Sequence, residues 1–183
     1  KNNKYFLDLG CGAGRHIKYL VENGYKCIGI DLSSVVIEQA KSMLNFHGIC
    51  KSSYKLINCN SNNIPLKNNS IDYVISDSSV DSMPSEEIVG TINEVYRLIK
   101  KKGLFYVNII SKTSKNHQFG KFINKYDFLI KSKHEKNTIQ SYFTEKRIKE
   151  VFSKFKILHC YIVTERVKNR ILNSRYHLIL KKH

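Results

Sequence analysis

Short apolar runs alternate along this chain with longer segments in which apolar residues recur at helical spacing. The short runs predict seven strands, at about residues 4–9, 26–31, 53–59, 70–76, 104–110, 155–164 and 174–180. The helical spacing predicts helices at about residues 15–23, 33–48, 85–103 and 144–152. Strands that alternate with helices favour a parallel sheet, so the pattern by itself predicts an α/β protein.

Residues 111–142 break this pattern, because they are polar and basic and show no sustained periodicity. A long irregular excursion within a compact domain is usually functional. The chain has 183 residues, 42% of them hydrophobic, which is enough for one well-buried domain and too few for two. We therefore expect a single domain over residues 1–183, in which 111–142 is an irregular insertion that covers the substrate site.

The sequence carries no sign of a membrane segment or a metal site. It has no run of about eighteen apolar residues, and no charged-then-apolar signal segment precedes the first strand. We therefore expect a cytoplasmic protein that does not enter the membrane. The five cysteines form no C-x-x-C pair and no Cys/His cluster at zinc spacing, so we predict reduced thiols and no metal.

The net charge of +16 comes entirely from the second half of the chain. Residues 92–183 hold 22 Lys or Arg and 6 Asp or Glu, whereas residues 1–91 hold 9 of each. A basic second half favours an acidic substrate or an acidic surface such as RNA. The chain is also rich in Asn, Ile and Lys, and in such a composition surface lysines accumulate without function, so both interpretations stay open.

The stretch that is most informative about chemistry is Tyr-Phe-Leu-Asp-Leu-Gly-Cys-Gly-Ala-Gly-Arg-His at residues 5–16. Alternate glycines after an apolar strand let the backbone turn sharply and let a ligand approach the peptide groups. A dinucleotide fingerprint would need its third glycine at position 15, where this chain has Arg. The next strand ends in Asp31, about twenty residues past the glycine turn, where a carboxylate can accept hydrogen bonds from both ribose hydroxyls of a nucleotide-like ligand.

The D-x-G-x-G-x-G spacing from Asp8 to Gly14 resembles motif I of the class I S-adenosylmethionine (SAM) dependent methyltransferases, in particular the small quinone-biosynthesis and tellurite-resistance methyltransferase-like group. Residues 71–76 are similar to the family's F-D-x-V-x-S, and residues 94–103 are similar to its E-x-x-R-V-L-K-P-G-G. The chain departs from the family where Asn60 and Ser61 replace an Asp-Ala pair. It also lacks the histidine that many relatives carry after the fourth strand.

This resemblance implies a three-layer α/β/α Rossmann-like sandwich, whose seven-stranded, mostly parallel sheet has the order 3-2-1-4-5-7-6. It implies that SAM binds across the carboxyl ends of strands one, two and four and leaves as S-adenosylhomocysteine (SAH). The implied cofactor-binding residues are Asp8, Gly10, Cys11, Gly12, Gly14, Asp31, Leu32, Asn60, Ser61 and Ser76.

Direct methyl transfer from a sulfonium requires no obligatory catalytic residue, since alignment and desolvation can supply much of the rate. Candidates on the acceptor side are Asp77, His134, Glu135 and Tyr142. Relatives usually close the cofactor site with helices ahead of the first strand. Because the first strand here begins near Lys4, we expect residues 111–142 to provide the cover.

For function, we expect methyl transfer to a small metabolite or modified sugar, and the basic second half favours an anionic one. The first alternative is an RNA methyltransferase, for example one that acts on tRNA. The second is a SAM-binding protein without catalysis, which the missing histidine motivates. The sequence identifies neither the acceptor atom nor the oligomeric state.

Overall fold

The computed structural model describes residues 4–115, 120–131, 137–168 and 170–183. The main sheet is formed by β1 Tyr5–Leu9, β2 Lys26–Asp31, β3 Tyr54–Asn58, β4 Ile71–Asp77, β5 Ile99–Ile110, β9 Lys156–Val167 and β10 Arg170–Lys181. The helices are α1 Arg15–Glu22, α2 Ser34–Phe46, α3 Ser85–Leu98 and α4 Glu145–Val151, with short 3-10 turns at η1 Lys51–Ser53 and η2 Val80–Ser82. Three further strands, β6 Gly120–Phe122, β7 Asp127–Ile130 and β8 Ile139–Ser141, form a sheet of their own.

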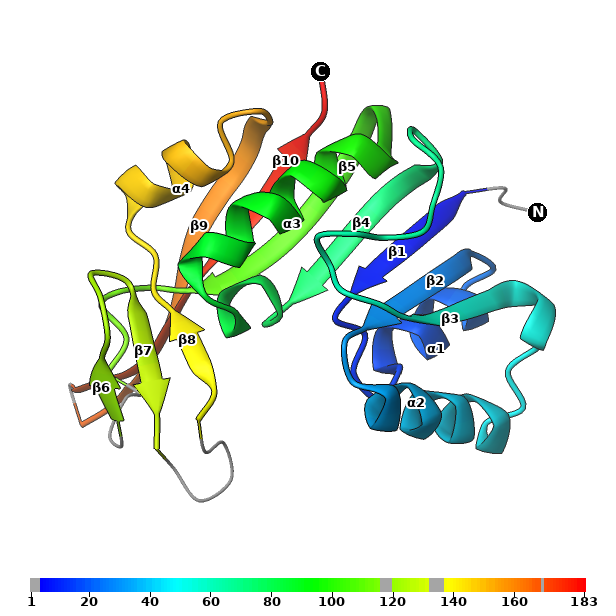
Figure 1. Cartoon of the computed structure of the whole chain (residues 1–183), viewed down its shortest axis with the longest axis horizontal. Helices are drawn as coiled ribbons and strands as arrows, with labels where there is room; N and C mark the ends of the chain where they lie inside the picture. Colours follow the sequence, from blue (N-terminus) through cyan, green and yellow to red (C-terminus); the bar gives the residue numbers. More distant parts are fainter. Residues whose placement is uncertain (1–3, 116–119, 132–136, 169) are drawn as a thin grey trace.

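The main sheet has the order β3-β2-β1-β4-β5-β10-β9, with β10 antiparallel to both of its neighbours (Figure 1). The other pairings in this sheet are parallel. When the three strands of the small sheet are set aside, this is the order 3-2-1-4-5-7-6. The predicted fold class and sheet topology are therefore confirmed.

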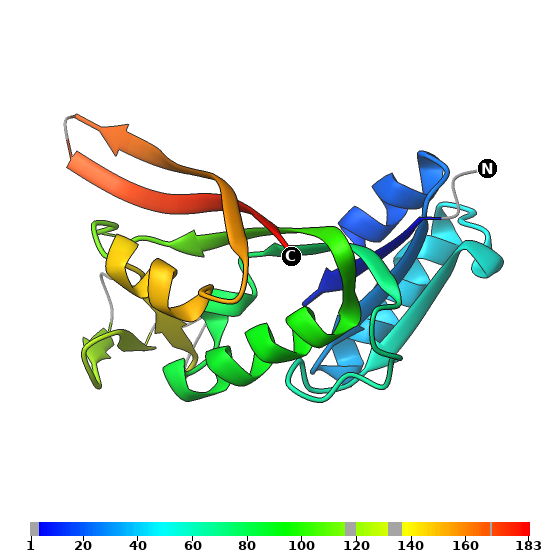
Figure 2. The same cartoon turned by 90° about the horizontal axis from the view of Figure 1, so that it is seen from above.

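Helices cover the two faces of the sheet in different places. Neighbouring residues of a strand point to opposite faces, and Phe6 packs into the apolar cluster of α1 and α2 while Leu7 packs into the cluster beneath α3 and α4. Figure 2 shows α3 and α4 together on one side of β4, β5 and β10. The sandwich therefore has three layers, a sheet with helices on each of its two faces.

The expectation that residues 111–142 are irregular is wrong for the part that the structure describes. Strands β6, β7 and β8 pair there in an antiparallel sheet, with Phe122 opposite Phe128 and Phe128 opposite Gln140. The strands are only three or four residues long. Such short segments give too few repeats for an alternating pattern to stand out in the sequence.

Buried polar side chains tie this small sheet to the main domain. The carboxylate of Asp127, which is 3% exposed, accepts hydrogen bonds from the Ser85 backbone N–H (3.0 Å) and from the Ser141 hydroxyl. The buried Arg147 guanidinium donates to the Tyr142 carbonyl oxygen (2.6 Å) and to Ser85 Oγ (2.8 Å). The small sheet is thus docked onto the start of α3.

Two predicted boundaries are also corrected. Lys100, Lys101 and Lys102 belong to β5 and not to the end of a helix, because the buried Ile99 already pairs with β4. The segment between the last two predicted strands, residues 165–173, is mostly strand, since β9 runs to Val167 and β10 begins at Arg170. The joined ends of these two strands extend well beyond the helices in Figure 2. The sequence at the end of this hairpin is polar and exposed, so it is hydrogen bonding between the two strands that orders it, and not burial.

Candidate functional site

A cavity of about 310 Å³ opens at the carboxyl ends of the parallel strands. Open α/β sheets bind ligands at this edge. The residues that line the cavity come from the last residues of β2 and β4, from the segments that follow β1, β2, β3 and β4, and from the start of α3: Gly10, Ile30, Asp31, Leu32, Cys59, Asn60, Ser61, Asp77, Ser78, Ser79, Ser82, Met83 and Glu87.

The glycine turn forms one wall of this cavity. The backbone N–H groups of Gly10 and Cys11 both donate to the Ile30 carbonyl oxygen at 2.9 Å, which fixes the turn to the end of β2. Gly10 has a left-handed φ of 72°, and a Cβ there would lie 2.1 Å from Ser79 Oγ. Only glycine lets the turn after β1 pack this closely against the loop after β4.

Asp31 connects the glycine turn to the start of α2. Its Oδ2 accepts a hydrogen bond from the Gly12 backbone N–H (3.1 Å), and its Oδ1 accepts one from the Ser33 backbone N–H (3.0 Å). The carboxylate is therefore held at the cavity wall before any ligand binds. A preorganised acceptor of this kind suits the hydroxyl groups of a ribose.

Asn60 and Ser61 lie on the cavity wall after β3, and each has a partner within the protein. Asn60 Oδ1 accepts from the Asn62 backbone N–H (3.1 Å), and Ser61 Oγ lies 2.8 Å from Thr91 Oγ1. The structure thus places Gly10, Asp31, Leu32, Asn60 and Ser61 around one cavity, as expected of a shared ligand site.

The other predicted cofactor residues lie behind this wall. Asp8, Cys11 and Ser76 are buried, and Gly12 and Gly14 shape the turn without lining the cavity. Burial raises the pKa of Cys11 to about 12, with Asp8 and Asp31 adding to the effect. Neither oxygen of the Asp8 carboxylate has a hydrogen-bond partner among the described residues, although Asp8 is 1% exposed.

Of the four acceptor-side candidates, Asp77 lines the cavity. Tyr142 is 2% exposed and packs with Ile110 and Phe128, and burial raises its pKa to about 12. The structure therefore places Tyr142 in a small apolar cluster and away from the cavity wall. His134 and Glu135 lie outside the described residues.

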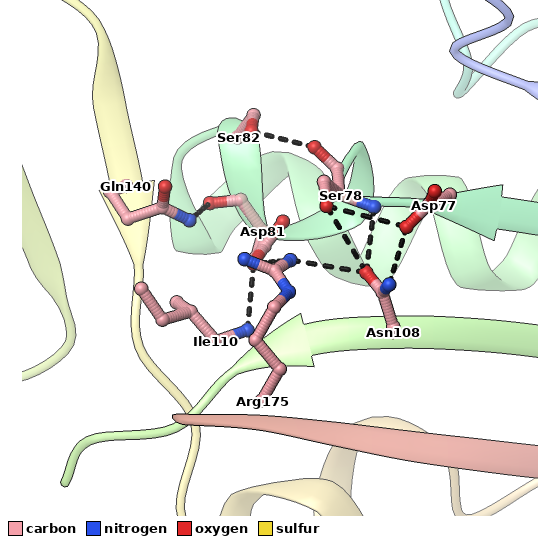
Figure 3. A network of polar contacts seen from close by, with 8 residues as sticks. All are labelled: Asp77, Ser78, Asp81, Ser82, Asn108, Ile110, Gln140 and Arg175. Carbon is pink, nitrogen blue, oxygen red and sulfur yellow. Dashed lines mark hydrogen bonds and ion pairs between the residues drawn. The ribbon is translucent and has the colours of Figure 1, made fainter. Parts of the chain in front are cut away.

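A network of polar side chains runs from the cavity wall into the main sheet (Figure 3). The Asn108 side chain donates to Asp77 and accepts from the Ser78 backbone N–H (2.8 Å) and from Arg175 Nη2 (3.1 Å). Arg175 also donates to Asp81 Oδ2 (2.6 Å) and forms an ion pair with this buried carboxylate. Asp77 is thus held by groups on β5 and β10, both of which lie far from it in the sequence.

Beyond this network, the backbone carbonyl of Asp81 accepts a hydrogen bond from Gln140 Nε2 at 2.7 Å (Figure 3). Gln140 belongs to β8, so the small sheet lies against η2. The residues next along the chain, Ser82 and Met83, line the cavity. The docked sheet therefore adjoins one side of the cavity.

Sequence reasoning missed His16, which is in the first turn of α1. Its Nδ1 lies 3.5 Å from Asp8 Oδ1 and its Nε2 lies 3.5 Å from Asp77 Oδ2. The Asp8 carboxylate raises the pKa of His16 above its ordinary value of 6.5; burial opposes this shift, and the Asp77 charge supports it. A histidine directly after a glycine turn was the available signal, but only the fold shows that it lies between two carboxylates.

Comparison with known proteins identifies the family. Residues 7–107, more than half of the chain, match the family profile described as a methyltransferase domain.

The chain belongs to this methyltransferase family.

The family predicted from the glycine turn and Asp31 is therefore confirmed, and SAM is the cofactor of the class.

Similar proteins agree with this assignment. A SAM-dependent methyltransferase from Methanosarcina mazei superposes with a TM-score of 0.85 at 20% identity, covering 100% of this chain and 93% of that chain. The 1,6-didemethyltoxoflavin-N1-methyltransferase of Burkholderia thailandensis, with its bound 1,6-didemethyltoxoflavin and SAH, has a TM-score of 0.72 at 14% identity and covers 99% and 72%. At these identities the likeness shows the fold alone.

By sequence, the chain is 28% identical over 109 residues to the uncharacterized protein MJ1252 of Methanocaldococcus jannaschii. This match covers 60% of the present chain but only 38% of the relative's length.

No helix among the described residues has the length and apolar character needed to cross a membrane. In the same part of the chain, no group of three or more His, Cys, Asp or Glu side chains could hold a metal ion.

Proposed function

We propose that this domain binds SAM in the cavity at the carboxyl ends of β1, β2 and β4 and transfers its methyl group to a small anionic metabolite or modified sugar. The observation that carries the proposal is the fixed Asp31 carboxylate on the wall of a 310 Å³ cavity. In this assignment Asp31 binds the ribose, and Asn60 and Ser61 lie beside the adenine.

The residues present fit such a cofactor. Gly12 leaves the backbone open at the turn, since nothing lies within 4 Å of a Cβ built on it. SAM supplies an already activated methyl sulfonium, so the protein has to align the acceptor and exclude water. Asp77 also lines the cavity, and in this assignment its carboxylate lies near the cationic groups that SAM carries.

A small acceptor is favoured by the way in which the small sheet is docked. Gln140 joins β8 to η2, and Asp127 and Arg147 join the small sheet to the start of α3. A sheet fixed in this position lies against η2, and both Ser82 of η2 and the following Met83 line the cavity.

One observation favours RNA as a second candidate acceptor. The second half of the chain holds 22 Lys or Arg against 6 Asp or Glu, and exposed Arg166, Lys168 and Arg170 lie on or beside the projecting β9–β10 hairpin. Positive side chains on an extended hairpin suit a phosphate backbone. Binding of this kind would weaken steeply as salt is added.

A methyl-transfer screen with labelled SAM tests the proposal. The protein would be incubated with pooled metabolites and, separately, with RNA from the source cell, and Asp31→Ala would serve as the cofactor-site control. Label in a small molecule, lost in the variant, supports the leading proposal, and label in RNA supports the second candidate. SAH binding without turnover on any acceptor would instead identify a SAM-binding protein without catalysis.

A further inference from the structure

The buried carboxylate of Asp8 has one charged partner within reach in the described part of the chain. The side chain is 1% exposed, neither of its oxygens has a hydrogen-bond partner there, and the ion pair is with His16 Nδ1 at 3.5 Å. Burying an unpaired carboxylate is costly, and a nearby positive charge offsets that cost. His16 provides that charge only when its ring carries two protons.

The second ring nitrogen of His16 points to another acid. Its Nε2 lies 3.5 Å from Asp77 Oδ2, and the imidazole itself is 37% exposed. A neutral imidazole has a single N–H, so it would direct a lone pair at one of the two carboxylates, whereas an imidazolium can donate to both. The charged groups around the ring are Asp8 and Asp77, which favour the imidazolium, and Arg15, which opposes it.

Asp77 links this pair to the cavity. Its Oδ1 is held by the Asn108 amide, which in turn contacts Arg175. The imidazolium lies within ion-pair distance of the other oxygen, Oδ2, for which no other partner is found among the described residues. A chain of polar contacts therefore runs from Asp8 in β1, through His16, Asp77 and the neutral Asn108 amide, to Arg175 in β10.

We propose that His16 is a positioning residue, whose imidazolium joins the buried Asp8 to Asp77 and fixes the Asp77 carboxylate on the cavity wall, so that cofactor affinity depends on the protonation of His16. The proposal rests on the SAM-binding function proposed above. The role of Asp8, the acidic residue of the glycine motif, is then indirect. Asp8 is too deeply buried to line the cavity, so it acts through His16. Loss of the proton leaves Asp8 uncompensated and removes the charged partner of Asp77 Oδ2, while Oδ1 stays bonded to the Asn108 amide.

The test is calorimetric titration with SAH between about pH 6 and pH 8.5, where a histidine with a raised pKa loses its proton. The wild type is compared with His16→Gln, His16→Lys and the control His47→Gln, which removes an exposed histidine at the end of α2. At each pH, the affinity of each protein for SAH is divided by the affinity of His16→Gln for SAH. Any pH dependence that comes from the ionisation of SAH itself cancels in this ratio.

In the wild type, this ratio should fall by about tenfold as the pH rises, which is the effect of losing one charged hydrogen bond. His16→Lys, which keeps a positive charge through this range, should bind tightly with no such fall. His47→Gln should follow the wild type. By linkage, SAH should also raise the pKa of the His16 ring, which nitrogen-detected NMR of the wild type measures without any variant.

The outcomes separate this inference from the function on which it rests. If SAH fails to bind the wild type at every pH, both are overturned. If SAH binds with an affinity ratio that is constant or rises with pH, or if SAH leaves the His16 ring pKa unchanged, the positioning role is overturned and the SAM site stands. A rise with pH would mean that the imidazolium competes with the cations of the cofactor.

Discussion

Replacing Asp31 with Ala should weaken SAH binding by about 1.5–3 kcal/mol, the range for a hydrogen bond to a charged group. At about 1.4 kcal/mol for each factor of ten, this is a loss of roughly tenfold to a hundredfold from the micromolar affinity that we expect. The variant also loses the acceptor for the Gly12 and Ser33 backbone N–H groups. Since Asp31 is only half-buried, water can replace these bonds at a cost to stability of about 1 kcal/mol.

A double-mutant cycle separates the ribose contact from the effect on the turn. Affinities for SAH and for 2′-deoxy and 3′-deoxy analogues would be measured by calorimetry in the wild type and in Asp31→Ala. If the carboxylate binds the ribose, removing a hydroxyl weakens binding in the wild type and has little effect in the variant, which gives a coupling energy of about 1–2 kcal/mol. Glu38→Ala, which removes a carboxylate that is 68% exposed on α2, controls for net charge.

Two results would refute this reasoning. Unchanged SAH affinity in folded Asp31→Ala would remove Asp31 from the cofactor site. Weakened affinity without coupling to either hydroxyl would show that Asp31 acts only by fixing the turn at Gly12. Circular dichroism and urea denaturation confirm that the variant is folded before either result is interpreted.

Gly12→Ala and Gly24→Ala both place a Cβ at a left-handed φ with nothing within 4 Å, so each should cost about 1–2 kcal/mol in urea denaturation. Only the Gly12 variant should lose SAH binding; equal affinity in both would remove the turn from the site. Asp127→Asn should destabilise the fold by about 1–3 kcal/mol, because it disrupts buried hydrogen bonds that tie down the small sheet. Although burial raises the pKa of Asp127, the hydroxyls and N–H groups around it hold that pKa below 3.8, so its contribution should persist at neutral pH and disappear only as the pH falls through the folded-state pKa. A thiol-reactive dye at pH 7 should label the exposed Cys50 first, since hydrogen bonds from Ser52 lower its pKa, and Cys11 only after unfolding; the reverse order would contradict this assignment.

The sequence by itself determined the family and most of the sheet. Apolar runs bounded by polar turns located the seven main strands, and for the parallel strands the reason is that a buried parallel strand needs continuous apolar residues. The glycine turn and Asp31 are local features, whose spacing reflects backbone conformations that few other residues permit. The expected cofactor side of the cavity could therefore be predicted from short segments of the first 61 residues.

Only the tertiary structure decided what surrounds the acceptor side. The small sheet has strands too short to show a period, and it is ordered by long-range bonds between Asp127 and Ser85. His16 becomes significant only when β1 and β4 bring Asp8 and Asp77 to its two ring nitrogens. Contacts of this kind join residues that are distant in the sequence, and their energy depends on burial and on the geometry between strands, neither of which a local pattern contains.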